Sequence, residues 1–395
     1  MRAAVPTDDS PETVLPAAFP PAFAFVVATQ FVFGLAVATY AILPSVVIRH
    51  LHGTSDEVGL ASALLAFGAL AASPFAGLAL DRFGRKRMVF AGSIATALAS
   101  GAFAFLLDHE TFALPLLVLV GMAAVLVVNG VITIVADLAP PEALGRAVGW
   151  QGAATMLANA IAPTAAEKVG PALSWHAPFY GSALIAAATA LMALRLPEDP
   201  PRASAAERPR GSAWRTTLSL APLLLVAFLS GATYTAIATF QQPHVLAQGA
   251  TSVKAYFMGF SAGALLMRLG FGSLPDRLGH VRAARLSLAL YALVALAFAA
   301  IGPLTLGLGG FGHGLAHGVF YPSLIALAFR TADANGRGLA ATITNGAFNG
   351  GSALSAFALG RLAQEVGTSS VFVVGALSVA TAILFVRAPK ETHGH

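Results

Sequence analysis

Long apolar runs separated by short polar segments make up most of the 395 residues of this chain. Each run is about 20 residues long, which is the length that a helix needs to cross the roughly 30 Å hydrocarbon core of a membrane. The runs are continuously apolar, so the pattern favours helices over the alternating strands of a membrane barrel. It predicts an all-α integral membrane protein with twelve transmembrane helices. The expected spans are 22–48, 56–80, 87–107, 113–136, 146–166, 176–195, 218–245, 253–275, 283–301, 304–329, 338–360 and 369–387.

Composition favours the same class of protein. Hydrophobic residues make up 57% of the chain and charged residues 10%, whereas charged residues make up about 25% of an average soluble domain. One long polar, proline-rich segment divides the expected helices into six and six. The expected organisation is a tail at 1–21, a six-helix bundle at 22–195, a central loop at 196–217, a second bundle at 218–387 and a tail at 388–395.

Basic residues are distributed unevenly between the connecting segments. If the first tail lies inside the cell, the segments on that side hold eighteen Lys and Arg residues, and the segments on the other side hold four. Positive residues gather on the cytoplasmic side of membrane proteins, so we expect both termini in the cytoplasm. Topology then accounts for the net charge of +5. The expected partner is the lipid bilayer, with no nucleic acid.

The two halves share a sequence repeat. The stretch "GLALDRFGRKR" at 77–87 returns as "GSLPDRLGHVR" at 272–282, so a shift of 195 residues aligns the two copies. Internal duplication of a six-helix unit is typical of secondary transporters, in which a site between the halves is exposed to each side of the membrane in turn. The repeat therefore predicts alternating access.

The first copy of this repeat resembles the signature of the major facilitator superfamily, which is G-x-x-x-D-R-x-G-R-[KR] after the second helix. The matching residues are Gly77, Asp81, Arg82, Gly84, Arg85 and Lys86. The stretches "DLAPPEALGRAVG" at 137–149 and "GHGLAHGVFYPSLIAL" at 312–327 are similar to those of bacterial arabinose-efflux and drug-efflux permeases. The resemblance implies two pseudo-symmetric six-helix bundles in a bacterial inner (plasma) membrane. It also implies a monomeric, non-enzymatic carrier of a small-molecule substrate.

A carboxylate among cations suits a loop that bonds the ends of neighbouring helices, because the N-terminal end of a helix carries partial positive charge. The resemblance implies that this loop is a conformational latch. Its expected residues, with the second copy and the partners, are Gly77, Asp81, Arg82, Gly84, Arg85, Lys86, Asp276, Arg277, Arg146 and Arg337. We expect Asp81 to meet the start of the eleventh helix near Arg337, and Asp276 to meet the start of the fifth near Arg146. A simple cytoplasmic anchor is the alternative for the cations.

Two histidines lie within the tenth span. His313 and His317 are one helical turn apart, and Tyr321 follows one turn later. No Asp or Glu lies deep in the first, fourth or seventh span, and histidine titrates near neutral pH. Either histidine is therefore a candidate carrier of a coupled proton. A structural histidine bonded to a backbone carbonyl is the alternative, and a metal site is disfavoured because no third ligand lies nearby in the sequence.

Other polar residues in the spans are costly in hydrocarbon and are expected to face a cavity or a partner. The expected substrate-binding residues are Gln30, Tyr40, Asn129, Tyr234, Gln241, His313, His317, Tyr321, Asn345, Asn349 and Arg268. Bonds that pack helices together are the alternative for the amides. For Arg268, the alternative to attracting an anionic substrate is a structural role beside the second copy of the repeat.

Together these patterns predict a secondary active transporter that carries out proton-coupled efflux of a drug-like or sugar-like metabolite. Uptake or facilitated diffusion of a sugar or organic anion is an alternative that suits the missing carboxylates. Alanines at 158–167, in place of the glycines common in proton-driven exporters, weaken the prediction of proton exchange. A non-transporting membrane sensor is a further alternative. The sequence has no phosphate-binding loop and no nucleophile–base pair of recognisable spacing. We therefore expect neither an ATP-driven pump nor an enzyme, and no cofactor or metal.

Overall fold

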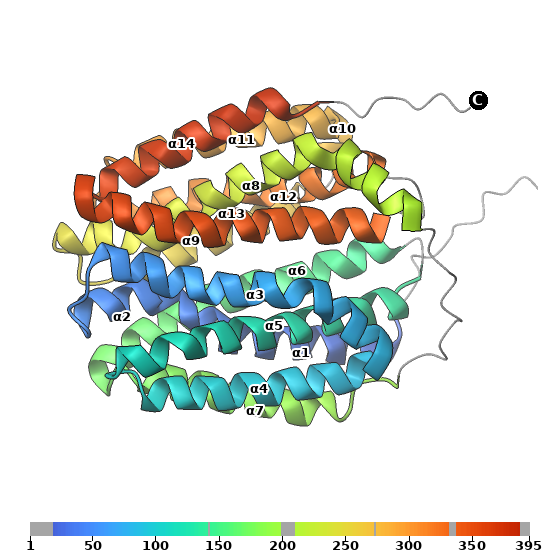
Figure 1. Ribbon diagram of the computed structural model, residues 1–395, viewed down its shortest axis with the longest axis horizontal. Coiled ribbons are helices and arrows are strands. Elements are labelled where there is room, and N and C mark those ends of the chain that lie inside the picture. Colours follow the sequence, from blue (N-terminus) through green and yellow to red (C-terminus); the bar gives the residue numbers. More distant parts are fainter. Residues whose placement is uncertain (1–18, 141–142, 199–209, 272–273, 332–336, 388–395) are drawn as a thin grey trace, which may run out of the picture.

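The computed structural model describes residues 19–140, 143–198, 210–271, 274–331 and 337–387. The first half forms α1 (Pro21–Ala38), a 3-10 turn (Thr39–Ile42), α2 (Leu43–Arg49), α3 (Ser55–Phe83), α4 (Arg85–Phe105), α5 (Glu110–Leu138), α6 (Leu144–Ala172) and α7 (Ala177–Ala193). The second half forms α8 (Arg210–Ala247), α9 (Lys254–Leu265), a π-helical turn (Leu266–Gly270), α10 (Leu274–Leu278), α11 (His280–Phe298), α12 (Leu306–Thr331), α13 (Arg337–Val366) and α14 (Thr368–Phe385). Figure 1 shows the two halves as two groups of helices lying side by side with similar axes.

Seven spans in the described part of the chain are long and apolar enough to cross a membrane by length and composition. One of them joins α1 and α2 through the 3-10 turn as a single span. Helices α6, α7, α9, α12 and α13 run among these spans but are shorter or carry more polar residues. Taken together, these elements account for the twelve expected crossings, so the predicted all-α membrane fold is confirmed. The exact domain limits stay predictions, because both tails and residues 199–209 lie outside the described residues.

The two halves pack their helices in the same pairs. In the first half, α1 packs on α6 and α7, α5 on α3 and α4, and α4 on α7. In the second half, α8 packs on α13 and α14, α12 on α9 and α11, and α11 on α14. If the crossings of each half are numbered from one to six along the chain, the same numbered crossings pack together in both halves. The main contacts between the halves, α3 with α13 and α6 with α9, are related by the same correspondence.

The repeated motif has the same backbone conformation in both copies. Gly84 joins α3 to α4 with φ of 94°, and Gly279 precedes α11 with φ of 81°. The shift of 195 residues aligns these two glycines. Positive φ is readily accessible to glycine and strained for residues that carry a Cβ. The motif therefore needs glycine here to reverse the chain direction within one residue.

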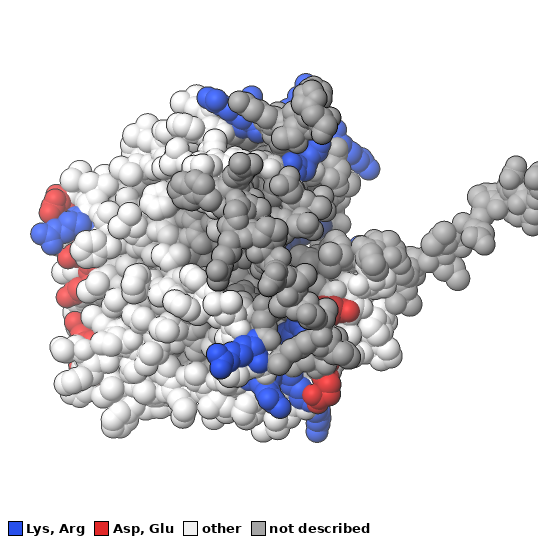
Figure 2. All heavy atoms as spheres, turned by 45° about the vertical axis from the view of Figure 1, so that its right-hand side comes forward, with Lys and Arg blue, Asp and Glu red and all other residues white. Residues whose placement is uncertain are grey.

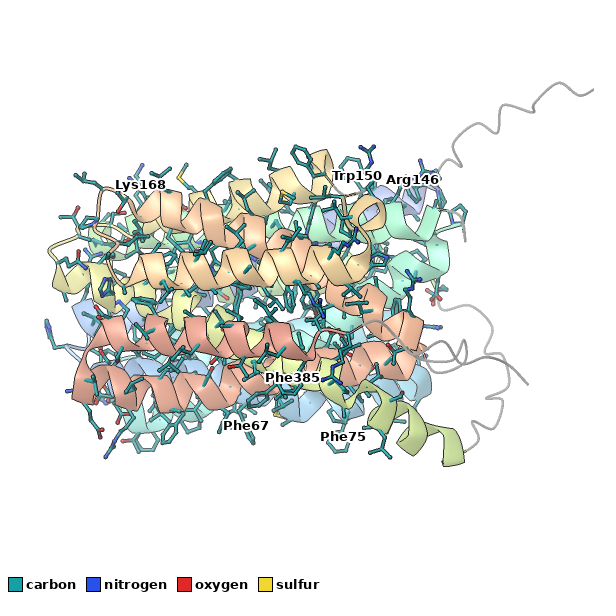
Figure 3. All side chains as sticks on the ribbon, turned by 90° about the horizontal axis from the view of Figure 1, so that it is seen from above. Phe67, Phe75, Arg146, Trp150, Lys168 and Phe385 are labelled. Carbon is teal, nitrogen blue, oxygen red and sulfur yellow. The ribbon has the colours of Figure 1, made fainter. Side chains whose placement is uncertain are left out.

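Large apolar side chains cover the periphery of the bundle. Leu98 of α4, Leu184 of α7 and Leu293 of α11 are all exposed. Figure 3 shows Phe67 and Phe75 of α3 at the rim, directed away from the other helices. Apolar surface of this extent is rare on soluble monomers, and it fits contact with lipid chains.

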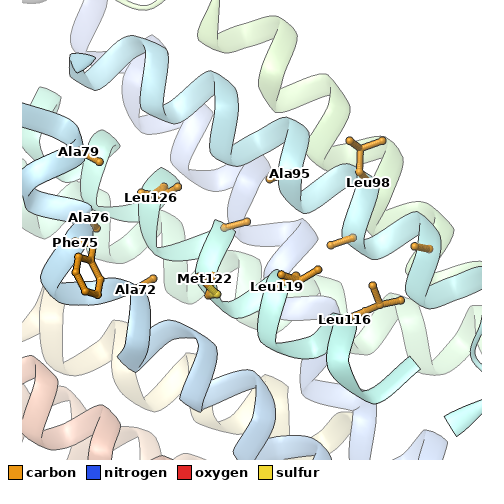
Figure 4. Close-up of a pocket in the computed structure, with 13 residues that line it drawn as sticks. Ala72, Phe75, Ala76, Ala79, Ala95, Leu98, Leu116, Leu119, Met122 and Leu126 are labelled. Carbon is orange, nitrogen blue, oxygen red and sulfur yellow. The ribbon is translucent and has the colours of Figure 1, made fainter. Parts of the chain in front are cut away.

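A hollow of about 640 Å³ opens on this periphery between α3, α4 and α5. Figure 4 shows its lining, which includes Phe75, Leu98 and Met122. All of its lining residues are apolar, so it offers no side chain that could orient a hydrogen-bonding solute. The hollow belongs to the lipid-facing surface rather than to a transport path.

Charge distinguishes the two ends of the bundle. In Figure 2, red Asp and Glu side chains gather along the left-hand edge, most of the visible Lys and Arg lie at the right, and some Asp and Glu lie among these cations. We call the first the acidic end; it holds the connections α2–α3, α4–α5 and α6–α7. The second, the basic end, holds the α3–α4 connection with Arg85 and Lys86. The expectation that the basic end faces the cytoplasm stays a prediction.

Replacing Gly84 or Gly279 with alanine should lower the free energy of unfolding by about 1–2 kcal/mol, because alanine is strained at positive φ. Gly77→Ala is the matched control, since Gly77 lies inside α3 and a Cβ there meets no atom within 4 Å. It should leave the unfolding temperature unchanged or raise it. The measurement is thermal unfolding in detergent, followed by intrinsic fluorescence. Equal unfolding temperatures for all three variants would contradict the role assigned to the two glycines.

Candidate functional site

A cavity of about 430 Å³ lies between the two halves. Helices α1, α2, α3, α5 and α6 and the 3-10 turn line it from the first half, and α8, α9 and α13 line it from the second. Among the described residues, no Asp, Glu, Lys, Arg or His contributes to the lining. Its polar lining residues are Gln30, Tyr40, Ser62, Thr155, Asn159, Tyr234, Thr235, Thr239, Tyr256, Asn349 and Ser352. The cavity is therefore neutral, with both hydrogen-bonding and aromatic walls.

Four of the expected substrate-binding residues line this cavity, namely Gln30, Tyr40, Tyr234 and Asn349. The Gln30 Nε2 group donates a hydrogen bond of 3.2 Å to the Thr155 hydroxyl, and Gln30 Oε1 is buried without a bonding partner. A buried acceptor without a partner costs free energy, so a solute donor would be stabilised there. The Tyr40 hydroxyl lies 3.0 Å from Ser100 Oγ inside the first half.

His313 lies behind the cavity wall and is fully buried. Its Nδ1 lies 2.7 Å from the hydroxyl of Tyr256 on α9, and its Nε2 lies 2.8 Å from the hydroxyl of Tyr291 on α11. The Tyr291 hydroxyl also lies 3.4 Å from Nδ1 of His317. Tyr256 itself lines the cavity. A hydrogen-bonded chain therefore runs from the cavity wall through Tyr256, His313 and Tyr291 to His317.

Aromatic rings surround this chain. The ring centroid of Tyr234 on α8 lies 5.4 Å from that of His313 and 5.1 Å from that of His317. His317 stacks on Tyr321, whose hydroxyl donates to Asn345 Oδ1 at 2.5 Å and so joins α12 to α13. The sequence predicted these residues as substrate contacts. Tyr234 lines the cavity, whereas His313, His317, Tyr321 and Asn345 do not.

Two expected amides lie elsewhere. Asn129 is half-buried on α5 and does not line the cavity. Gln241 on α8 is fully buried, and both polar atoms of its side chain are without a partner. In this conformation, neither Asn129 nor Gln241 contacts the cavity.

Arg268 occupies the π-helical turn that follows α9. Such turns are rare and are frequent at functional sites. Its guanidinium group packs against Gly152 of α6, where any Cβ would collide with it. The charge of Arg268 acts on His317 and Tyr321. Arg268 thus contacts the other half of the protein beside the histidine chain.

A carboxylate that the sequence analysis did not single out joins the halves at the acidic end. Glu167, near the end of α6, is 5% exposed. It accepts hydrogen bonds from the backbone N–H of Val253 at 2.6 Å and from the hydroxyl of Ser252 at 3.0 Å. It therefore caps α9 of the other half, where the helix dipole stabilises an anion. Arg49 lies 3.7 Å away and balances the charge. In the sequence, the feature that could have pointed to Glu167 is its position as an acidic residue at the end of an apolar run.

Two further contacts join the halves at this end. Gln242 of α8 accepts a hydrogen bond of 2.7 Å from the Ser45 hydroxyl and donates one of 2.7 Å to the backbone carbonyl of Ala41. Asp56 of α3 lies 3.7 Å from Arg361 of α13. Three separate polar contacts therefore hold the halves together at the acidic end.

The expected latch has partners within the first half at the basic end. Arg85 lies 3.5 Å from Asp137 at the end of α5, and Lys86 lies 2.6 Å from Glu198 after α7. The hydrogen bond from Lys86, together with its charge, holds the pKa of Glu198 below its ordinary value. These two ion pairs connect the α3–α4 loop to neighbouring helices of the same half.

The remaining latch residues are less informative. Arg82 lies over the ring of Phe83, Arg146 lies over the ring of Phe19, and Arg277 is exposed. The side chains of Asp81, Asp276 and Arg337 lie outside the described part of the structure. The contacts expected between these side chains and the helix starts therefore stay predictions.

The comparison with known families decides the class of this protein. The family model of the Major Facilitator Superfamily matches residues 25–311 and 223–395, which overlap and cover nearly the whole chain. The chain belongs to the Major Facilitator Superfamily. This membership fits the seven apolar spans, counted over the described residues, of a multi-pass membrane protein.

Relatives within the superfamily are similar over part of the chain. Multidrug resistance protein 1 of Bacillus subtilis (strain 168) is 26% identical over 183 residues, 46% of each chain. Multidrug resistance protein 2 of the same organism is 32% identical over 158 residues, 39% of this chain and 38% of the relative. The chain thus matches less than half the length of these relatives. A crystal structure of a mutant of the nucleoside transporter NupG has a TM-score of 0.75 at 15% identity, covering 92% of this chain and 98% of NupG, and it shares the fold.

Replacing Glu167 with glutamine should open the acidic end more often, because a hydrogen bond to a charged group contributes about 1.5–3 kcal/mol and a neutral amide bonds more weakly. The chain has no cysteine, so Ser62→Cys in the cavity wall reports access. Its labelling by a membrane-impermeant maleimide from the acidic side should be about 10-fold faster in the Glu167→Gln variant.

Glu110→Gln is the matched control, since Glu110 is an exposed glutamate at the same end of the bundle. It should leave the labelling rate of the cavity cysteine unchanged. Equal labelling in the Glu167→Gln variant and its parent would contradict the role of Glu167 in holding the halves together.

Proposed function

We propose that this transporter exports a small amphipathic, drug-like or sugar-like solute by alternating access, in exchange for protons. The observation that carries the proposal is the neutral cavity between two halves that polar contacts join at the acidic end. In alternating access the halves rock about a central site, so contacts at one end break while those at the other end form. We infer that the acidic end faces outward.

The chemistry of the cavity supports an amphipathic solute. Its volume falls within the range of about 300–1,000 Å³ that holds drug-sized ligands. Phe33, Phe260 and Phe348 offer apolar contacts, and Gln30 and Asn349 offer hydrogen bonds. Aromatic faces also attract cations. The names of the two Bacillus relatives, multidrug resistance proteins, fit the efflux of such solutes.

The histidine chain supports proton coupling, because it has two complementary hydrogen-bond directions. A neutral imidazole has one donor and one acceptor nitrogen. In the first direction, Tyr256 donates to His313, His313 donates to Tyr291, and Tyr291 donates to His317. In the second, each of these bonds is reversed. When one proton enters at Tyr256 and another leaves at His317, every hydrogen bond of the chain reverses from the first direction to the second. His313 or His317 carries the positive charge during this transfer.

The proposed latch acts at the basic end. Asp81 and Arg85 would help to hold the first half against the start of α13 when that end is closed, with Asp276 acting on α6 in the same way. Glu167 plays the corresponding part at the acidic end, since it is an anion that caps a helix of the other half. The two ends would then close by the same chemistry.

Arg268 favours a second candidate substrate class. Its guanidinium group lies between the halves, and its Nε is buried without a partner. An organic anion reaching this position would supply the missing acceptor. Uptake or facilitated diffusion of an organic anion is therefore the alternative function.

Replacing His313 with glutamine should abolish the solute accumulation that a pH gradient drives while binding is retained, because glutamine can bond both tyrosines but cannot carry a proton. Tyr291→Phe should have the same effect, because it removes the bridging hydroxyl and changes little else. The measurement uses purified protein in liposomes with an imposed pH gradient. Its panel contains sugars, organic anions and lipophilic cations.

Tyr180→Phe is the matched control, since Tyr180 is an exposed tyrosine on α7, and it should transport like the parent. Normal gradient-driven accumulation by the His313→Gln variant would contradict the coupling role. Joint loss of binding, flux and thermal stability would instead assign His313 a structural role.

A further inference from the structure

Three side chains from three connections meet at the acidic end, away from the transport cavity. His50 follows α2, Asp108 lies between α4 and α5, and His176 precedes α7. His50 Nε2 lies 2.8 Å from Asp108 Oδ1, and His176 Nε2 lies 3.2 Å from Asp108 Oδ2. One ligand atom from each side chain lies within 4.8 Å of the other two. The carboxylate thus gathers two imidazole nitrogens around one point.

We propose that His50, Asp108 and His176 bind a divalent transition-metal ion, and that Zn²⁺ fits this ligand set best. Zn²⁺ binds histidine nitrogen and carboxylate oxygen at about 2.0–2.2 Å in tetrahedral geometry, which places neighbouring ligand atoms about 3.4 Å apart. The observed nitrogen–oxygen separations of 2.8 and 3.2 Å are close to this value. Small side-chain rotations therefore admit the ion, and water completes the fourth position. Mg²⁺ and Ca²⁺ fit less well because they select oxygen ligands.

A neighbouring hydroxyl orients one of the ligands. Ser174 Oγ accepts the backbone N–H of His176 at 3.2 Å and lies 2.9 Å from His176 Nδ1. An oxygen partner on the second ring nitrogen fixes the orientation of a metal-binding histidine. The side chains of His50 and His176 are 27% and 24% exposed. They are held in place and can still be reached by an ion from water.

The cation next to His50 in the chain is paired elsewhere. Arg49, the chain neighbour of His50, lies over the ring of Trp175 at 5.2 Å and pairs with Glu167 at 3.7 Å. Its positive charge is therefore balanced by a different carboxylate. Asp108 remains available to the two histidines and the ion.

The same contacts connect the metal site to the junction of the halves. Arg49 and Trp175 are the chain neighbours of two ligands, and Arg49 contacts the carboxylate that caps α9. An ion that fixes His50 and His176 restrains Arg49 above Trp175 and stabilises closure of the acidic end. This consequence rests on the proposed alternating-access function, whereas the metal site does not.

The site is tested by binding of Co²⁺, whose visible absorption reports tetrahedral ligation, followed by displacement with Zn²⁺. All proteins lack an affinity tag and carry His393→Asn and His395→Asn, so that imidazoles of the tail do not bind metal. The parent should bind one Co²⁺ per chain. His50→Ala and His176→Ala should each weaken Co²⁺ binding by about 100-fold or more. Loss of a residue that only orients a metal ligand already weakens binding by about 10- to 100-fold.

His109→Ala is the matched control, because His109 is exposed and directly follows Asp108. It should bind Co²⁺ like the parent. Equal binding by the parent and the His176→Ala variant, or no binding by the parent, overturns the site.

The consequence for closure has its own measurement. Zn²⁺ should slow maleimide labelling of the Ser62→Cys variant several-fold and leave labelling unchanged when His176→Ala is added. Unchanged labelling in the protein that does bind metal overturns the link to closure, while the site itself stands.

Discussion

Polar groups inside this bundle must be bonded by the protein itself, because the surrounding hydrocarbon offers them no water. Backbone groups meet this constraint by forming helices. Many buried side chains meet it by pairing, as in the Tyr40–Ser100 bond and in the bonds between His313 and two tyrosines. Where a pair joins the two halves, the same requirement ties the position of one bundle to that of the other.

The contacts between the halves combine apolar packing with a few polar bonds. One apolar cluster contains residues of both halves, and Met156 of α6 packs with Phe260 and Ala264 of α9. At the acidic end, Glu167 and Gln242 add a few hydrogen bonds to this packing. A small number of polar contacts can break and re-form together at modest cost, while a packed core is too dense to deform gradually. The two bundles are therefore suited to move as rigid bodies about the cavity between them.

Much of the fold could be predicted from the sequence, because span length and the internal repeat are direct consequences of the membrane and of gene duplication. The glycines of the two motif copies even share positive φ. The site was harder to predict, since burial in a membrane bundle does not reveal whether a polar residue faces the cavity or another helix. His313 illustrates this, because its place within the tenth span was predicted but its partners, Tyr256 and Tyr291, lie on other helices.

Contacts between the halves were equally hidden from sequence reasoning. Glu167 closes the acidic end by capping a helix that starts 87 residues later, at Lys254. No local sequence pattern around Lys254 predicts this capping residue, because Glu167 belongs to the other bundle. The positions of Ser252 and Val253 become meaningful only when α6 and α9 are placed side by side.

The central claim is that the halves rock about the cavity, and distances between spin labels test it most directly. Labels on cysteines introduced at His109 and Leu304 report on the acidic end, and labels at Arg87 and Arg282 report on the basic end. All four residues are exposed, and the two sites of each pair are related by the shift of 195 residues. The account predicts that a change in pH or addition of substrate lengthens one distance and shortens the other. Distances that stay single and unchanged at both ends would contradict it.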